Sequence, residues 1–466
     1  MLLPYKQSTL GPFITNEDVN GDGLADLFIG GASGQSAVLY IQKKDGTFRK
    51  KGTQAFINDK NYEDMESVIF DFDNDNDLDL FVVSGGNEFA NYSSLYADRL
   101  YINNGQGDFV RATINSLNSN PKSGASVDVI DYDRDGDFDL LVGNRIIPQN
   151  YPVHSPSTLW KNENGTLIDV TETIIPEFSD FGIINDIKTT DFDNDGWADF
   201  IAVGEWSKIG FFKNLNGKLF KSENKNAFNG DKGWWFSANE TDINNDGLPD
   251  YIIGNIGLNI KYKTDKKKEF KVYSTDFDNN GTPDIVLSKK YNGEYVPVRG
   301  RECSSQQMPF IQQKFETYSE FANAKLVDIY GEKLNTAYEA KANEFQSILL
   351  INKGEGQFKK TYLPIEAQLF PLMKTVFKDV NGDGFEDAIL GGNIYNTEVE
   401  TPRLDAISGL LLLSNGSDGY TSSKTNSSGI FLEGNIKDLT ILNSKERNLL
   451  ISTSNNGPLT VHQWNY

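Results

Sequence analysis

A nine-residue acidic loop recurs seven times along this chain of 466 residues. Every copy has Asp or Asn at positions 1, 3, 5 and 9, so oxygen-bearing side chains alternate with other residues. The copies are DVNGDGLAD from Asp18, DFDNDNDLD from Asp71, DYDRDGDFD from Asp131, DFDNDGWAD from Asp191, DINNDGLPD from Asp242, DFDNNGTPD from Asp276 and DVNGDGFED from Asp379. Such oxygens can surround one hard cation, and Ca²⁺ fits best because it takes about six to eight oxygen ligands in flexible geometry. The repeat predicts Ca²⁺ sites, up to seven, with Mg²⁺ as the weaker candidate.

The expected ligands are the side chains at positions 1, 3, 5 and 9 and the backbone carbonyl at position 7. They are Asp18, Asn20, Asp22, Leu24 and Asp26; Asp71, Asp73, Asp75, Asp77 and Asp79; Asp131, Asp133, Asp135, Asp137 and Asp139; Asp191, Asp193, Asp195, Trp197 and Asp199; Asp242, Asn244, Asp246, Leu248 and Asp250; Asp276, Asp278, Asn280, Thr282 and Asp284; and Asp379, Asn381, Asp383, Phe385 and Asp387. The loops that begin at Asp71 and Asp131 carry the most carboxylates, so we expect them to bind more tightly than the loops with Asn at position 3 or 5.

Plain turn formation is the competing interpretation, because Asp, Asn and Gly all favour turns. It does not explain the Asp at position 9, and carboxylates packed about 4–6 Å apart without a cation have raised pKa values. An EF-hand loop fits poorly because it needs a Glu at position 12. That position is apolar here, with Ile29, Val82, Val142, Ala202, Ile253, Leu287 and Leu390.

The formal net charge of −22 would oppose binding to nucleic acids and to anionic membranes. The loops hold 26 Asp residues, and seven divalent ions would reduce the net charge to −8. The first residues lack a signal-peptide pattern, and no apolar run is long enough to span a membrane. Because weak multi-oxygen sites fill at the calcium levels found outside cells, we expect part of an exported protein, extracellular or on the cell surface in association with an outer membrane.

A second pattern, a strand, a turn rich in Asn and Gly, and another strand, follows most loops and indicates a hairpin. It reads LYIQKKDGTF from Leu39, LYINNGQGDF from Leu100, LWKNENGTL from Leu159, FFKNLNGKLF from Phe211 and LLINKGEGQF from Leu349. Each unit thus comprises four antiparallel strands with the acidic loop between the first two. Repeats of this length predict an all-β fold, a β-propeller of four-stranded blades that forms one domain over residues 1–466.

Loop spacing favours seven blades. Only 34 residues separate Asp242 from Asp276, so we expect those two loops to share one blade; a blade for every loop would give eight. The last unit, residues 435–464, lacks the acidic loop and stops after its third strand. We therefore expect the N-terminal segment 2–10 to add the missing strand and close the ring.

Residues 295–343 do not follow the repeat, and they predict a small helical insertion. Capping boxes at Thr317 and Thr336 mark two helix starts, and Gly331 marks a helix end. Candidate ligand contacts there are Arg299, Arg301, Gln306, Gln307, Phe310 and Tyr318. The alternative for the two arginines is that salt bridges pin the insertion onto the ring.

Other residues leave two interpretations open. Trp206, Trp234 and Trp235 could stack on sugar rings or fill the core between blades. His154 lies in a Pro-rich segment and is the histidine to test for catalysis, whereas His462 falls in the last predicted strand and reads as structural.

The loops closely resemble those of the FG-GAP/VCBS repeat family, the calcium-loop propellers similar to the integrin α head, over nearly the whole chain. The stretches VRGRECSSQQMPF from Val298 and KFETYSEFANAKLVDIYG from Lys314 are similar to cartilage-acidic-protein-like VCBS surface proteins of Bacteroidetes. This resemblance implies the propeller of a larger exported or lipid-anchored protein.

Three functions fit these observations. The first is a calcium-stabilised, non-catalytic extracellular binding or adhesion module that recognises a protein or glycan partner, with neither nucleic-acid binding nor direct membrane insertion. The second is a polysaccharide-active, lyase-like enzyme, which would need a base beside a charge-neutralising group. The third is a structural spacer in a larger surface protein.

Overall fold

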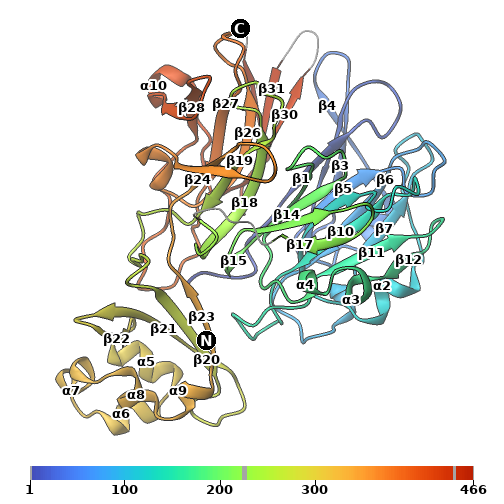
Figure 1. The fold of residues 1–466 in the computed structure, drawn as a ribbon. Coiled ribbons are helices and arrows are strands. Elements are labelled where there is room, and N and C mark those ends of the chain that lie inside the picture. The colour runs from blue at the N-terminus through green and yellow to red at the C-terminus, as the bar shows by residue number, and fades with distance from the viewer. Residues whose placement is uncertain (1–2, 223–227, 444–447, 465–466) are drawn as a thin grey trace.

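Antiparallel sheets are the main secondary structure of the computed structural model, which describes residues 3–222, 228–443 and 448–464 (Figure 1). The first four sheets are β1 (Ile14–Glu17), β2 (Asp26–Ile29), β3 (Val38–Gln42) and β4 (Phe48–Lys51); β5 (Asp64–Phe70), β6 (Asp79–Ser84), β7 (Arg99–Ile102) and β8 (Val110–Arg111); β9 (Gly124–Ile130), β10 (Asp139–Asn144), β11 (Thr158–Asn162) and β12 (Leu167–Asp169); and β13 (Asp186–Thr190), β14 (Asp199–Val203), β16 (Gly210–Asn214) and β17 (Leu219–Lys221). The all-β, propeller-type fold predicted from the sequence is confirmed.

Three further sheets complete this series. They are β15 (Glu205–Ser207), β18 (Gly233–Thr241), β19 (Asp250–Asn255), β24 (Ile348–Asn352) and β25 (Phe358–Tyr362); β26 (Leu372–Lys378), β27 (Asp387–Gly392), β28 (Leu410–Ser414) and β29 (Tyr420–Ser422); and β30 (Ile436–Asn443), β31 (Asn448–Ser454) and β32 (Thr460–Trp464). Short helices connect strands: α1 (Gln54–Asn58), η1 (Ser94–Tyr96), α2 (Asn115–Ser119), α3 (Thr171–Ile174), α4 (Pro176–Ser179), η2 (Ile365–Gln368) and α10 (Thr425–Ser428).

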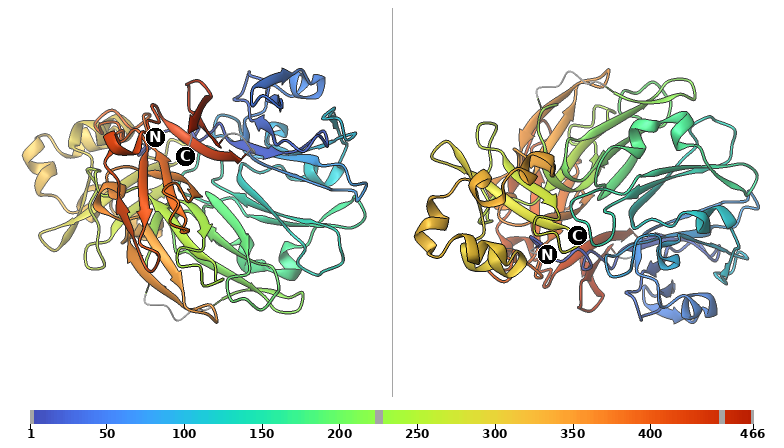
Figure 2. Two further views of the ribbon diagram at one scale, coloured as in Figure 1. Left: turned by 90° about the horizontal axis from the view of Figure 1, so that it is seen from above. Right: turned by 90° about the horizontal axis from the view of Figure 1, so that it is seen from below.

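The first strands of these seven sheets lie side by side in chain order, and β30 returns to β1 (Figure 2). Side chains on one first strand bond the backbone of the next. Asp186 Oδ2 accepts the Ala238 N–H at 2.8 Å, and Asp438 Oδ2 accepts the Ile14 N–H at 2.8 Å. The second strands are buried on both faces, which explains their continuous apolar runs.

The predicted closure by the N-terminal segment is wrong. Lys6 N–H donates to Asn396 O at 2.9 Å, so this segment runs beside the chain that follows β27 and adds no strand to the described part of the last sheet. The reason is burial: Tyr5 is only 3% exposed and its ring packs against Trp234 and Phe236. The ring closes through contact between β1 and β30 instead.

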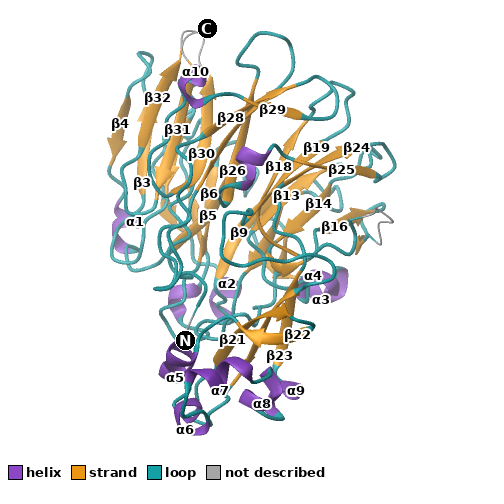
Figure 3. Ribbon diagram, turned by 90° about the vertical axis from the view of Figure 1, so that its left-hand side faces the viewer, coloured by secondary structure: helices purple, strands orange, loops and turns teal. Residues whose placement is uncertain are grey.

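An additional sheet lies outside this ring, between β19 and β24 in the chain. It consists of β20 (Phe270–Thr275), β21 (Asp284–Tyr291), β22 (Glu294–Pro297) and β23 (Tyr338–Ala342). Helices α5 (Arg301–Gln307), α6 (Phe310–Lys314), α7 (Tyr318–Asn323), α8 (Leu326–Tyr330) and α9 (Lys333–Thr336) accompany it. We call residues 270–342 the lobe; it stands at one end of the molecule (Figures 1 and 3).

The predicted sharing of one blade by the fifth and sixth loops is therefore wrong. The fifth loop joins β18 to β19 in the ring, whereas the sixth joins β20 to β21 in the lobe. The lobe sheet is stable outside the ring because it has two covered faces. Ile311 and Ile329 of the helices pack with Val286 on one face, and Phe270 stacks on Trp206 of the ring on the other.

One capping box is confirmed and one is wrong. Thr317 Oγ1 accepts the Glu320 N–H at 3.2 Å, and Gly331 follows the last residue of α8. Thr336 ends α9 instead of starting a helix, because the chain after it becomes β23 and pairs with β20.

Candidate metal centre

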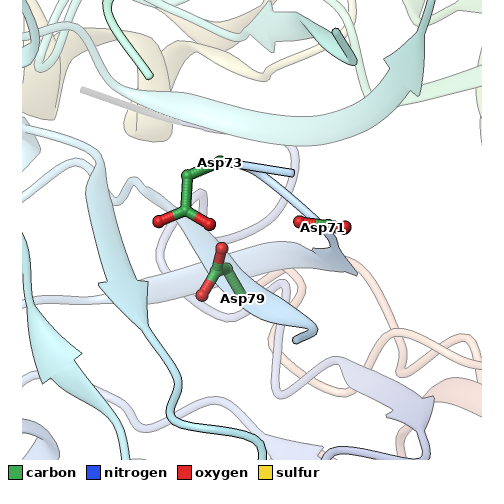
Figure 4. A group of neighbouring side chains, drawn as sticks. All are labelled: Asp71, Asp73 and Asp79. Atoms are coloured by element: carbon green, nitrogen blue, oxygen red, sulfur yellow. The ribbon is translucent and has the colours of Figure 1, made fainter. Parts of the chain in front are cut away.

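Carboxylates converge in four of the seven loops. In each, the Asp residues at positions 1, 3 and 9 offer oxygens that all lie within 4.8 Å of one another. The triads are Asp71, Asp73 and Asp79 (Figure 4); Asp131, Asp133 and Asp139; Asp191, Asp193 and Asp199; and Asp276, Asp278 and Asp284. The structure thus brings together three predicted ligands in each of these loops.

The loop backbone is shaped by its own side chains. The side-chain oxygen at position 5 accepts the N–H of position 7 in every copy, as Asp195 does from Trp197 at 2.9 Å. Positions 4 and 6 have positive φ in every copy, for example 59° at Asn194 and 85° at Gly196. This conformation explains why Gly and Asn predominate at both positions.

The Asp at position 9 anchors each ring loop to the third strand. Asp79 Oδ1 accepts the Asn103 N–H at 2.8 Å, and Asp199 Oδ1 accepts the Asn214 N–H at 2.7 Å. These carboxylates are almost fully buried, and burial is the main cause that raises their pKa values. The pKa rises to about 6 for Asp26, Asp79, Asp250 and Asp284, to about 7 for Asp139 and to about 8 for Asp199, and it is also raised for Asp387.

The third and fourth loops contain buried carboxylate oxygens that no hydrogen-bond donor reaches. They are Oδ1 of Asp131, Asp133 and Asp193 and Oδ2 of Asp199. Leaving a buried charged oxygen without a partner is costly, whereas a bound cation would satisfy it. The donor set and these oxygens therefore fit a hard divalent ion.

Two lysines that sequence reasoning missed neutralise part of this charge. Lys161 on β11 contacts Asp133 and lies 3.1 Å from Asp135, and Lys213 on β16 contacts Asp193 and lies 3.0 Å from Asp195. Both lysines immediately precede the Asn in the hairpin pattern, so the strings LWKN and FFKN carried the signal.

That Asn is a second residue type the sequence reasoning missed, because it was read only as part of a turn. Its amide donates to the position 2 carbonyl of the preceding unit's loop. The bonds are Asn103 Nδ2 to Val19 O, Asn162 to Phe72 O, Asn214 to Tyr132 O and Asn352 to Phe192 O, each 2.8 Å. Each of the first four loops is therefore held by its own sheet and by the next one.

In the remaining three loops position 3 is Asn. Its amide nitrogen donates to a carboxylate, from Asn20 to Asp26, from Asn244 to Asp246 and from Asn381 to Asp383, each at 2.9 Å. An amide presents its oxygen instead when it turns about its last bond, so a cation would require that rotation. The ligand sets predicted for these loops, and every predicted position 7 carbonyl ligand, stay predictions.

A scan against protein-family models matches FG-GAP-like repeats at residues 18–82, 71–142 and 191–253. Each stretch begins at the first residue of an acidic loop. The chain carries FG-GAP-like repeats. FG-GAP repeat propellers are generally non-enzymatic.

Several solved structures are similar at low identity. BBS1N in complex with ARL6DN is 9% identical with a TM-score of 0.41, and the match covers 99% of this chain and 97% of that one. The Vibrio cholerae biofilm matrix protein Bap1 is 10% identical with a TM-score of 0.37, over 97% and 86%. Sqt1 of Saccharomyces cerevisiae is 10% identical with a TM-score of 0.45, over 100% of each chain. A search of curated proteins gave no match.

The two arginines predicted as ligand contacts have different roles. Arg299 is buried, forms an ion pair with Glu398 and so ties the lobe to the segment after β27. Arg301 stays within the lobe, where its Nε donates to Phe315 O at 2.7 Å. The salt-bridge interpretation therefore holds for Arg299 and is wrong for Arg301.

The other predicted lobe contacts also have mostly local partners. Gln307 Nε2 donates to Ile285 O at 3.0 Å, and Phe310 is partly buried against the lobe core. Tyr318 is 63% exposed, and its hydroxyl donates to Glu302 at 3.1 Å. Gln306 is exposed. Of the six, Tyr318 and Gln306 remain accessible.

The tryptophans and histidines are now placed. Trp234 and Trp235 are completely buried and Trp206 is 6% exposed, which fits the core interpretation. His154 Nε2 lies 3.2 Å from Asp180, and His462 is partly buried on β32.

Among the helices described, none combines the length and hydrophobicity that crossing a bilayer requires.

Proposed function

We propose that this chain is a calcium-stabilised, non-catalytic binding module of an exported protein, which recognises a partner outside the cell. The observation that carries the calcium part is the set of buried oxygens without partners on Asp131, Asp133, Asp193 and Asp199. Turns alone do not require such oxygens, and an ion would neutralise them where they lie.

The side chains at positions 1, 3, 5 and 9 would hold each ion. A bound Ca²⁺ would supply positive charge at the loop centre and fix the loop against the second strand. The residues around it already connect neighbouring sheets, because the Asp at position 9 bonds the third strand and Asn214 bonds the preceding loop. Calcium would thereby stabilise the contacts between sheets.

The order of the strands puts the metal loops and the proposed partner-binding face on opposite sides of the ring. Every ring loop joins a first strand to a second strand, so all of them lie on one side of the ring. The connections from second to third strands lie on the opposite side, and the lobe grows from one of them, between β19 and β24. The ions would support the scaffold, while the lobe side is left for recognition.

The test is thermal unfolding of the full chain after metal removal and after readdition of calcium, together with a glycan array and a protein pull-down. We expect calcium to raise the melting temperature by 10 °C or more, on the order expected for several ions that bind only the folded state. We also expect a specific partner in the calcium-loaded state. An unchanged melting curve would overturn the calcium part, and no partner in either assay would favour a spacer.

A further inference from the structure

A cavity of about 330 Å³ opens between the ring and the lobe. The segment 205–209 after β14 contributes one part of its wall, and β23 of the lobe contributes another through Tyr338 and Glu339. It therefore lies on the side of the ring away from the six metal loops of the ring. Its volume is typical of a small-molecule site.

Two of the three acidic side chains that line this cavity, Glu205 and Glu339, are paired with cations. Glu205 is buried, lies 2.5 Å from Arg145 and accepts a hydrogen bond from Tyr151 at 2.8 Å. Glu339 lies 2.7 Å from Lys271, and Asp180 faces His154. Glu205 and Glu339 are therefore not left to neutralise further positive charge in the cavity, whereas the Asp180 side chain is 89% exposed to solvent.

Two lysines of the cavity wall have no such partner. Neither Lys208 nor Lys232 makes a side-chain hydrogen bond or ion pair with any part of the chain that the structure describes. Burial, followed by the charges of Lys341 and Lys208, lowers the pKa of Lys232. Glu269 is the acid whose charge most raises the pKa of Lys232, and it forms an ion pair with Lys341 at 2.9 Å. In a chain with a net charge of −22, Lys208 and Lys232 thus place two positive charges without an ion pair at one cavity.

The rest of the wall combines aromatic and polar groups. Phe181 and Tyr338 line the cavity with accessible rings, Tyr338 being 38% exposed, whereas Trp206 lies behind them at 6% exposure. Trp206 is held with a positive φ of 60°, and its indole N–H donates to Tyr151 at 2.7 Å. Strained backbone of this kind concentrates at binding sites. An aromatic wall beside cations suits a sugar ring that carries an anionic group, because the C–H face of the sugar packs on the aromatic ring while its hydroxyls stay hydrogen-bonded.

We propose that this cavity binds a carboxylated sugar, whose carboxylate lies between Lys208 and Lys232 and whose ring lies against the aromatic wall. This inference rests on the proposed binding function and names the ligand class for it. A salt-bridged hydrogen bond from each lysine to the carboxylate would satisfy charges that the protein itself leaves unpaired.

The experiment titrates the calcium-loaded full chain with D-galacturonate by isothermal calorimetry, with D-galactose, acetate and sulfate as separate probes. We expect saturable binding of galacturonate, at least tenfold weaker binding by Lys208→Gln and by Lys232→Gln, and no measurable binding of galactose. Lys44→Gln, at an exposed lysine of the turn before β4, is the matched control and should bind as the parent does. Equal binding of acetate or sulfate would overturn the assignment to a sugar.

A second measurement needs no variant. Galacturonate should protect Lys208 and Lys232 from an amine-acetylating reagent, read residue by residue by mass spectrometry, while Lys44 stays reactive. The proposal would be overturned if galacturonate neither protects Lys208 and Lys232 from acetylation nor gives a heat of binding in the calorimeter. The melting curves test the calcium proposal separately. If galacturonate binds but calcium does not raise the melting temperature, only the calcium proposal is contradicted.

Discussion

The Asp at position 9 of each loop has opposite effects on the stability of the metal-free and the calcium-bound protein. Asp199 is fully buried and its pKa rises to about 8, mainly because of burial, so the charged form is costly without a cation. With a cation the same charge is required. Asp199 therefore destabilises the folded protein when no metal is bound and stabilises it when calcium is bound.

Asp199→Asn should accordingly have effects of opposite sign. In chelator at pH 8 it should raise the free energy of unfolding, because it removes a buried charge. In calcium it should lower that free energy by on the order of 1–3 kcal/mol, because a ligand is lost. Urea unfolding in both conditions checks this. Asp45→Asn, at an acidic residue in the turn before β4 and outside every loop, is the control. The same sign in both conditions would contradict the account.

At the scale of elements, the unit of stability is a loop together with two sheets. Asn214 leaves β16 and bonds Tyr132 O in the loop of the preceding unit at 2.8 Å. Its backbone N–H bonds Asp199 of its own loop. A change at this Asn should therefore weaken the contact between two sheets without removing a predicted ligand.

Asn214→Ala should destabilise the calcium-loaded protein by about 1–3 kcal/mol, since Tyr132 O would be left buried without its donor. The number of bound ions should not change. Denaturant unfolding and elemental analysis measure the two quantities, with Asn335→Ala on the exposed side of α9 as the control. Loss of an ion would show that Asn214 acts on the site itself.

The strand–loop–strand unit could be read from the sequence because both of its signals are local: alternating oxygen ligands and an Asn–Gly turn. The position of the sixth loop could not, because Asp276 has the same local pattern as the ring loops. What places it in the lobe is the burial of Phe270 and Val286 between helices and ring, which is tertiary. Likewise, the path of the N-terminal segment depends on the pocket that receives Tyr5.

For the whole molecule, the raised pKa values predict how stability depends on pH. Without metal, Asp79, Asp139 and Asp199 have folded pKa values of about 6, 7 and 8, above the unfolded value of about 3.9. The folded state then binds more protons than the unfolded state between those values, so stability falls as pH rises through this window. Bound calcium would neutralise these carboxylates in place of the protons.

We therefore expect the metal-free protein to unfold at lower urea concentration at pH 8 than at pH 5. The stabilisation by calcium should be larger at pH 8 than at pH 5, because protons compete for the same carboxylates. Urea midpoints at the two pH values, with and without calcium, give both comparisons. A metal-free protein that becomes more stable as pH rises would contradict the assignment of these carboxylates.

The ring depends, in this account, on divalent ions that neutralise the buried carboxylates of its loops. Elemental analysis of the folded protein, after equilibration in about 1 mM calcium and removal of free ions, tests this directly. The four loops with three converging carboxylates predict at least four calcium ions per chain. Fully folded protein with no bound calcium would contradict the account.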